Sequence, residues 1–265
     1  MSVAKASLEA RGLVVRRGDR VVLHGLDLAL AAGTTTIVVG PNGAGKSTLI
    51  RALAGLAPVD AASGALLLDG APLDAVPARE RARRIGVFLE QPDATFDFSA
   101  RGSSAWSRFP HLGRALRRPR RRRGGRARAG RPRRAGAGRS PLRAAVLGRR
   151  QRIGLARVVA QDPDVWLLDE PTARLDPYHA LKVAGLMRAR RRRQVVLAAE
   201  HDLDLAAQFA DRLLILSHGR IVADGAPADV LTPERIAAVY GVRARRVPGE
   251  RAAVIIDGVV DRVEP

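Results

Sequence analysis

Residues 40–48 place the strongest constraint on how this chain of 265 residues can fold. Their sequence, Gly-Pro-Asn-Gly-Ala-Gly-Lys-Ser-Thr, fits the pattern G-x-x-x-x-G-K-[ST]. An aliphatic run at residues 36–39 precedes this loop, and residues 49–56 after it have leucines at helical spacing. The order strand, glycine-rich loop, helix is the context that a phosphate-binding loop requires. A simple glycine-rich turn is the disfavoured alternative.

Each residue type in the loop has a chemical reason to be there. Glycines let the backbone wrap closely, so that successive N–H groups point at phosphate oxygens, and the helix N-terminus adds a favourable dipole. Lys46 is expected to contact the β- and γ-phosphates, and the Ser47 hydroxyl to bind Mg²⁺. The predicted nucleotide-binding residues of the loop are Gly40, Pro41, Asn42, Gly43, Ala44, Gly45, Lys46, Ser47 and Thr48.

A pair of carboxylates at the end of an apolar run supplies the second half of a nucleotide site. The run Val165-Trp166-Leu167-Leu168 is followed by Asp169 and Glu170. Asp169 suits an outer ligand of Mg²⁺, and Glu170 suits a general base that orients the attacking water. A buried strand that ends in a charged turn is the alternative, and the phosphate-binding loop upstream makes it the weaker one.

Short aliphatic runs alternate with helical patterns along most of the chain. Residues 85–88 and 195–199 read as strands, and residues 177–190 and 203–209 read as helices. This alternation predicts an α/β fold, in which helices flank a sheet. No apolar run approaches the ~20 residues of a membrane helix, the N-terminus lacks a secretion signal, and cysteine is absent.

The formal charge of +20 belongs to one part of the chain. Residues 101–150 hold 18 of the 46 basic residues and none of the 26 acidic ones, so the remainder is nearly neutral. Glycine and proline interrupt this window, which has no apolar period. Few aromatic residues lie near it for stacking on bases, so we expect no nucleic-acid partner.

Together these motifs resemble the ATP-binding subunit of an ATP-binding-cassette (ABC) transporter. Three weaker matches fit the resemblance, and each has a simpler alternative. Gln91 resembles the glutamine loop, which touches Mg²⁺ and faces the membrane subunit, or is a solvated loop residue. Asp176 resembles the D-loop aspartate, or caps the helix that begins at Pro177. His201 resembles the switch histidine that contacts the γ-phosphate, or is a turn residue.

The sequence departs from the family in two places. The family has an aromatic residue that stacks on adenine where this chain has Arg17; a guanidinium can also stack on a base, and a solvated surface arginine is the equal alternative. The family signature, Leu-Ser-Gly-Gly-Glu, aligns with Ala-Val-Leu-Gly-Arg at residues 145–149. The hydroxyl that should contact the partner subunit's γ-phosphate is therefore missing, and we expect turnover to be impaired.

The resemblance implies a division of the chain. Residues 1–92 and 161–245 would form the ATPase core, a phosphate-binding-loop nucleoside triphosphatase fold with an antiparallel β layer from the N-terminal strands. Residues 93–160 would form a small helical subdomain, disrupted at 100–149, and residues 246–265 a C-terminal tail. We interpret residues 100–149 as translated out of frame in a GC-rich gene, because such codons yield Arg, Gly, Ala and Pro in a wrong frame. A genuine basic segment is the alternative, and resequencing the gene decides between them.

The resemblance also implies a function. This function is ATP hydrolysis with Mg²⁺, which drives import. The implied partners are membrane permease subunits and a second copy of the chain, and an external substrate-binding protein acts indirectly. The implied location is the cytoplasmic face of the membrane. Stretches such as Phe96–Ser99 and Val222–Pro227 resemble importers of iron-siderophore, haem or cobalamin. A soluble cassette ATPase acting on ribosomes or nucleic acid, and a non-hydrolysing ATP-binding remnant, are the alternatives.

Overall fold

A six-stranded sheet forms the centre of the molecule in the computed structural model, which describes residues 6–57, 59, 64–89, 151, 153–247 and 253–259. Its strand order is β10-β9-β3-β8-β7-β6. The strands are β3 (Thr35–Val39), β6 (Ile85–Phe88), β7 (Val165–Asp169), β8 (Val195–Ala199), β9 (Arg212–Ser217) and β10 (Arg220–Gly225). All neighbours are parallel except the β9–β10 hairpin. β3, β7 and β8 are buried at every position, because strands covered on both faces need continuous apolar runs.

The N-terminal strands form a separate antiparallel sheet of order β2-β1-β4-β5. Its members are β1 (Ser7–Arg17), β2 (Arg20–Ala31), β4 (Ala65–Leu68) and β5 (Ala71–Pro72). Burial alternates along the second half of β2, as expected of a strand with one face on the core and the other toward solvent. This is the antiparallel layer that the sequence predicts.

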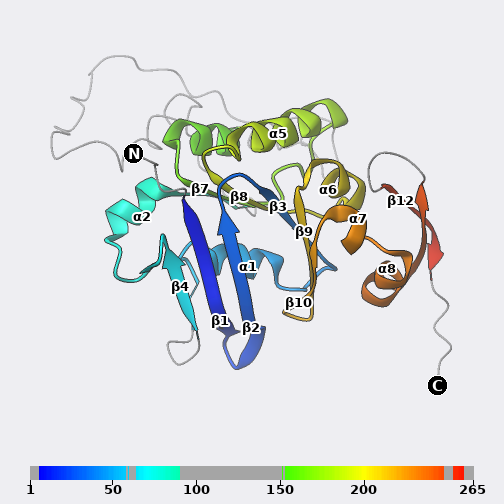
Figure 1. The fold of residues 1–265 in the computed structure, drawn as a ribbon, viewed down its shortest axis with the longest axis horizontal. Coiled ribbons are helices and arrows are strands. Elements are labelled where there is room, and N and C mark those ends of the chain that lie inside the picture. The colour runs from blue at the N-terminus through cyan, green and yellow to red at the C-terminus, as the bar shows by residue number, and fades with distance from the viewer. Residues whose placement is uncertain are drawn as a thin grey trace, which may run out of the picture.

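The pleat of the central strands divides their side chains between two faces. Val165 and Leu167 of β7 pack with the N-terminal sheet and with helix α1 (Lys46–Leu53), which lies between the two sheets (Figure 1). Trp166 and Leu168 pack on the opposite face against helix α5 (Pro177–Arg190). The remaining helices are α2 (Ala78–Arg84), α6 (Leu203–Phe209), α7 (Pro227–Val230) and α8 (Pro233–Tyr240). The fold is thus a layered α/β core that holds the ends of its central strands rigidly.

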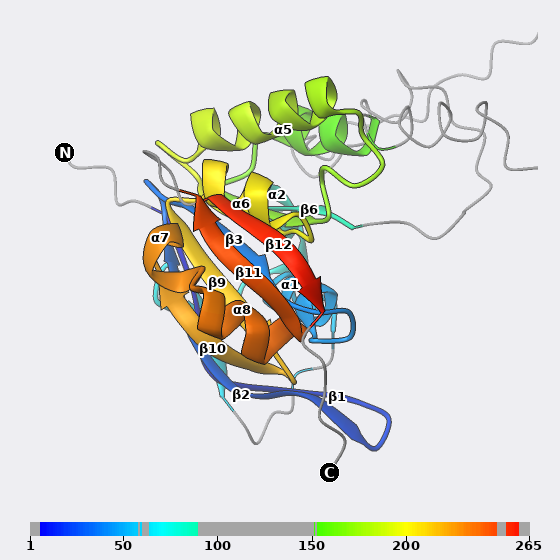
Figure 2. The ribbon, with the colours of Figure 1, turned by 90° about the vertical axis from the view of Figure 1, so that its right-hand side faces the viewer.

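The described part of residues 246–265, where the sequence predicts a tail, contains a strand. β12 (Ala253–Val259) pairs antiparallel with β11 (Val242–Val247), and the hairpin packs beside α8 and α6 (Figure 2). Of residues 93–160, the structure describes 151 and 153–160, which are helical. The signature at 145–149 and the basic window therefore lie outside the described residues, and the domain boundaries stay a prediction. Within the described residues no helix is long and apolar enough to span a membrane.

Candidate nucleotide-binding and hydrolysis site

The carboxyl ends of three neighbouring parallel strands meet at the candidate site. β8 lies between β3, which leads into the phosphate-binding loop, and β7, which ends at Asp169. Ala199, the last residue of β8, pairs with Val38 on one side and with Asp169 on the other. Residues predicted from three distant stretches of sequence therefore lie at one edge of one sheet.

Close packing explains two glycines of the phosphate-binding loop. A Cβ on Gly40 would lie 2.0 Å from the carbonyl oxygen of Leu216, so only glycine fits where the chain leaves β3. Gly45 has φ of 107°, in the left-handed region, and a Cβ there would lie 2.8 Å from Leu23. Two backbone hydrogen bonds hold the loop. The Ala44 N–H donates to the Pro41 carbonyl within the loop, and the Gly219 N–H donates to the Ala44 carbonyl from the turn between β9 and β10.

The Lys46 ammonium lies inside the loop. It is 5% exposed and donates to the carbonyl oxygens of Gly40 at 2.6 Å and Pro41 at 3.2 Å. Burial lowers the pKa of Lys46, and the carboxylates of Glu170 and Asp169 act in the opposite direction. The loop thus holds a cation next to the two acidic residues that the sequence places in the site.

Ser47 and Asp169 come together as predicted for a magnesium site. The Ser47 hydroxyl donates to Asp169 Oδ1 at 3.0 Å, and Asp169 is 2% exposed. A hydroxyl and a carboxylate side by side are the hard oxygen ligands that Mg²⁺ prefers, with phosphates and waters completing its shell. Among the described residues no group of three or more His, Cys, Asp or Glu is placed to hold a metal.

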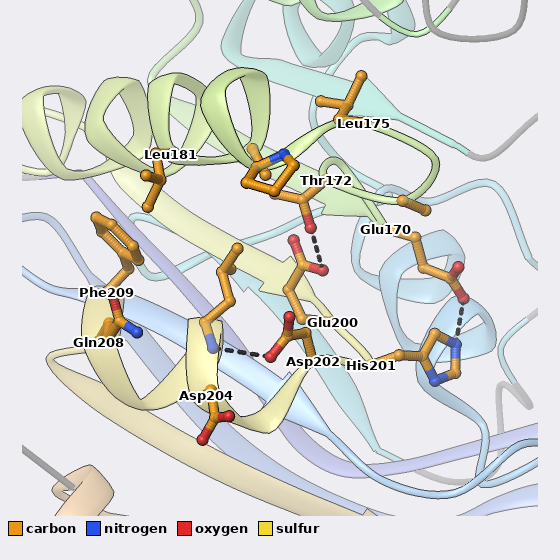
Figure 3. Close-up of a pocket in the computed structure, with 14 residues that line it drawn as sticks. Glu170, Thr172, Leu175, Leu181, Glu200, His201, Asp202, Asp204, Gln208 and Phe209 are labelled. Atoms are coloured by element: carbon orange, nitrogen blue, oxygen red, sulfur yellow. Dashed lines mark hydrogen bonds and ion pairs between the residues drawn. The ribbon is translucent and has the colours of Figure 1, made fainter. Parts of the chain in front are cut away.

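Glu170 and His201 are in direct contact. His201 Nε2 lies 2.5 Å from Glu170 Oε1 (Figure 3). A carboxylate oxygen only accepts, so this contact is a hydrogen bond in the tautomer of His201 that has its proton on Nε2. Glu170 has a φ of 52°, which is unusual for a residue other than glycine. Its N–H donates to the Ala199 carbonyl, and its own carbonyl accepts from Gln151 Nε2, so hydrogen bonds on both sides hold this conformation.

A pocket of about 530 Å³ opens beside this pair, between the segment after β7 and helix α6. Two buried residues that we did not expect in the site line it. Thr172 Oγ1 donates to Glu200 Oε2 at 2.8 Å (Figure 3). Burial raises the pKa of Glu200 to about 7, and the charge of Glu170 acts in the same direction while the Thr172 hydrogen bond opposes it.

The weaker sequence predictions have different outcomes. Asp176 caps helix α5, because its side chain accepts from His179 N–H at 2.9 Å, as the simpler alternative states. Arg17 is exposed at the end of β1 opposite Arg20. Gln91 lies outside the described residues. For Asp176, Arg17 and Gln91, contact with nucleotide or metal stays a prediction.

Sequence reasoning missed three supporting residues. They are Gln151, whose amide donates to the Glu170 carbonyl, and the hydrogen-bonded pair of Thr172 and Glu200. The available signal for Glu200 was its position directly after β8, and for Thr172 its position three residues after the end of β7. Gln151 follows no described strand end and had no such signal.

The fold and this site define an ATP-binding-cassette ATPase. The chain belongs to the ABC transporter family, whose model matches residues 23–173. It is an ATP-binding, ATP-hydrolysing subunit of such a transporter.

Known proteins resemble the chain over most of its length. It is 41% identical to the hemin import ATP-binding protein HmuV of Myxococcus xanthus (strain DK1622), over 94% of this chain and 96% of that protein. Its fold matches a metal-chelate type ABC transporter in an inward-facing conformation, with a TM-score of 0.67 and 20% identity over 95% of this chain and 97% of that one. It also matches a dimeric ATP-binding cassette bound to ADP and Pi, with a TM-score of 0.63 and 18% identity over 83% and 98% of the two chains.

Proposed function

We propose that this chain powers the import of hemin or a chemically related metal chelate. The observation that carries this substrate class is the 41% identity to a hemin import ATP-binding protein over almost the whole of both chains. Further curated relatives with the same description are 36–43% identical. This narrows the iron-siderophore, haem or cobalamin group expected from the sequence to its haem member.

The geometry of the site supports a role for each of its residues. The loop at residues 40–48 would wrap the phosphates, with Lys46 exchanging its carbonyl contacts for phosphate oxygens. Ser47 and Asp169 would hold Mg²⁺, which supplies electrostatic stabilisation of the phosphate charge when bound. Glu170 would accept the proton of the attacking water, and His201 would hold Glu170 in position and contact the γ-phosphate. Arg17 would stack on adenine, Gln91 would contact Mg²⁺, and Asp176 would contact the second subunit.

The proposed assembly contains two copies of this chain and membrane permease subunits. A dimer is supported by the dimeric cassette of matching fold and by the expected need for a signature from the second copy. Binding to permeases would place the chain at the cytoplasmic face of the membrane, and an external binding protein would deliver the chelate.

Hemin-dependent activity of the assembled transporter tests this proposal. The chain is co-expressed with a candidate hemin permease and reconstituted with that permease in proteoliposomes. We expect hemin uptake that requires ATP and is lost in Glu170→Gln, which keeps the shape of the side chain but not its basicity. Transport of an iron-siderophore or cobalamin with no transport of hemin would contradict the substrate class. Failure to co-purify with any membrane protein would contradict the assembly.

A further inference from the structure

Glu200 occupies a position that stability alone does not explain. Its side chain is 2% exposed, and its Oε1 has no hydrogen-bond partner among the described residues. Burying a carboxyl group with an unpaired oxygen is costly, whereas an apolar side chain of similar size would fill the same space without that cost. The buried carboxyl group of Glu200 therefore points to a function in the pocket that it lines.

The backbone and side chain of Glu200 connect the three strand ends of the site. Its N–H donates to the carbonyl of Val38 at 3.0 Å, one residue before β3 ends and the phosphate-binding loop begins. Its side chain accepts from Thr172, two residues after Glu170. The next residue in the chain is His201. The hydrogen bond between Glu200 and Thr172 therefore ties the segment that carries His201 to the segment that carries Glu170.

This hydrogen bond runs beside the contact that matters chemically. Figure 3 shows the Thr172–Glu200 and His201–Glu170 contacts as two parallel bridges between the same two segments. Thr172 is 8% exposed, so its hydroxyl competes little with water for Glu200, whereas the His201 side chain is 43% exposed. The buried Thr172–Glu200 hydrogen bond is therefore suited to set the distance between the two segments. The more exposed His201–Glu170 pair is open to a water molecule and to the nucleotide.

We propose that Glu200 is a positioning residue of the hydrolytic site, which fixes the spacing of Glu170 and His201 through its hydrogen bond with Thr172. The proposal rests on the roles proposed above for Glu170 and His201. Glu200 does not touch the nucleotide in this scheme. Its effect reaches the reaction only through the two residues that it holds in place.

Paired substitutions in the full chain test this hydrogen bond. Thr172→Val and Glu200→Leu remove the donor and the acceptor while nearly keeping side-chain volume, and Thr172→Ser restores the donor. Thr35→Val is the matched control, because Thr35 is fully buried and its hydroxyl has no hydrogen-bond partner among the described residues. Phosphate release is measured in single turnover with excess protein, and ATP affinity by equilibrium titration.

We expect Thr172→Val and Glu200→Leu each to slow phosphate release about tenfold or more, because small displacements of catalytic groups are costly. ATP affinity should stay within about twofold, since the phosphate-binding loop is untouched. The double variant should be no slower than the slower single one, because both remove one interaction. Thr172→Ser and Thr35→Val should behave as the unaltered chain. Rates of all variants within about twofold of Thr35→Val would overturn the proposal, and so would a parallel loss of ATP affinity.

The ring signals of His201 in NMR spectra give a readout that does not depend on turnover. Glu170→Gln defines the spectrum of His201 without its carboxylate partner. Thr172→Val and Glu200→Leu should move the ring signals toward that spectrum, and Thr172→Ser should not. Unmoved signals in both variants would overturn the proposal. If Glu170→Gln leaves phosphate release unchanged, the proposed role of Glu170 fails, and the ring signals still decide the role of Glu200.

Discussion

The position of Lys46 in the phosphate-binding loop predicts its role in ATP binding. It donates to two carbonyls of its own loop and is buried beside Asp169 and Glu170. Lys46→Ala should weaken ATP binding by ~1.5–3 kcal/mol, because a hydrogen bond from a charged group to phosphate is lost. Isothermal titration with Mg-ATP measures the change. Lys182→Ala, on the exposed side of α5, is the control and should bind as the unaltered chain does. An unchanged isotherm for Lys46→Ala would contradict the assignment of the loop.

The raised pKa of Glu200 predicts a pH dependence of stability. The ordinary value is 4.5, and the value in the folded chain is about 7. The folded state therefore binds this proton more tightly than the unfolded chain does. The resulting stability is complete below about pH 4.5 and is lost as the pH rises through about 7. The difference corresponds to roughly 3 kcal/mol.

Denaturant unfolding at pH 5 and pH 8 measures this dependence. Between these values the unaltered chain should lose about 2–3 kcal/mol relative to Glu200→Gln, which cannot ionise. Glu80→Gln, an exposed change on α2, is the control and should follow the unaltered chain. The same pH dependence in the unaltered chain and in Glu200→Gln would show that Glu200 titrates normally.

The sequence motifs identified the residues that we propose to react, and they did not identify the residues that hydrogen-bond beside them. The Ser47–Asp169 and Glu170–His201 contacts join residues that were each singled out by motif. Glu200 could not be predicted as buried, because glutamate at the end of a strand is usually solvated and nothing local marks Thr172 as its partner. A hydrogen bond between positions 28 apart depends on strand order, which appears only in the folded sheet.

Replacing glycine with alanine should have opposite effects on stability at two helical positions. A Cβ at Gly154, within the helical residues 153–161, would lie 2.7 Å from the buried ring of Phe88. A Cβ at Gly185 in α5 would meet nothing within 4 Å. Gly185→Ala should stabilise the chain by ~0.5–1 kcal/mol through helix propensity. Gly154→Ala should destabilise it by ~1–3 kcal/mol through overpacking.

Thermal or denaturant unfolding of the two glycine variants measures the change in the free energy of unfolding for each. The comparison is internally controlled, because each variant adds one methyl group to a helix. If both variants were stabilised alike, the contact of Gly154 with Phe88 would be wrong. The helix at 153–161 would then pack differently against β6.

Element prediction succeeded where apolar pattern and end signals agreed. Residues 177–190 form α5 as predicted, with Asp176 as the cap and Pro177 in the first turn. Strands 85–88 and 195–199 also match, because runs of four or five residues without a polar side chain suit a sheet covered on both faces. Helix α2 was missed because its sequence, Ala-Arg-Glu-Arg-Ala-Arg-Arg, buries no residue and so has no apolar period. Strand β12 was also missed: the Val-Ile-Ile run at residues 254–256 favours a strand, but its partner β11, Val-Arg-Ala-Arg-Arg-Val, has no such run to mark the hairpin.

At the scale of the whole molecule, the altered signature predicts slow turnover. In the family the signature of one subunit clamps the γ-phosphate held by the other, and residues 145–149 here offer no hydroxyl at that place. The loss of one preorganised donor costs ~10²–10³ in rate. The unaltered chain should therefore hydrolyse ATP at least ~10²-fold more slowly than a version carrying Leu-Ser-Gly-Gly-Glu at 145–149.

Steady-state phosphate release by the two versions tests this expectation, with Glu170→Gln in each as the background. In a third version the residues before 145 are also replaced with a helix-forming sequence of the family, because the signature of the family stands at the start of a helix. Equal turnover by the unaltered chain and both restored versions would mean that residues 145–149 are not a defective signature. It would also mean that the alignment of residues 145–149 with the signature is wrong.

The placement of β3 has a consequence for how the chain is made. β3 lies between β8 and β9, and Thr35 at its start hydrogen-bonds to Asp211, 176 positions later. A ribosome delivers the N-terminal half first, so this aliphatic strand emerges long before either neighbour exists. Closing so long a loop costs little more at equilibrium than closing a shorter one, but distant pairing slows folding. The nascent chain is therefore exposed to aggregation for most of its synthesis, and a product halted before residue 195 cannot complete the sheet around its phosphate-binding loop.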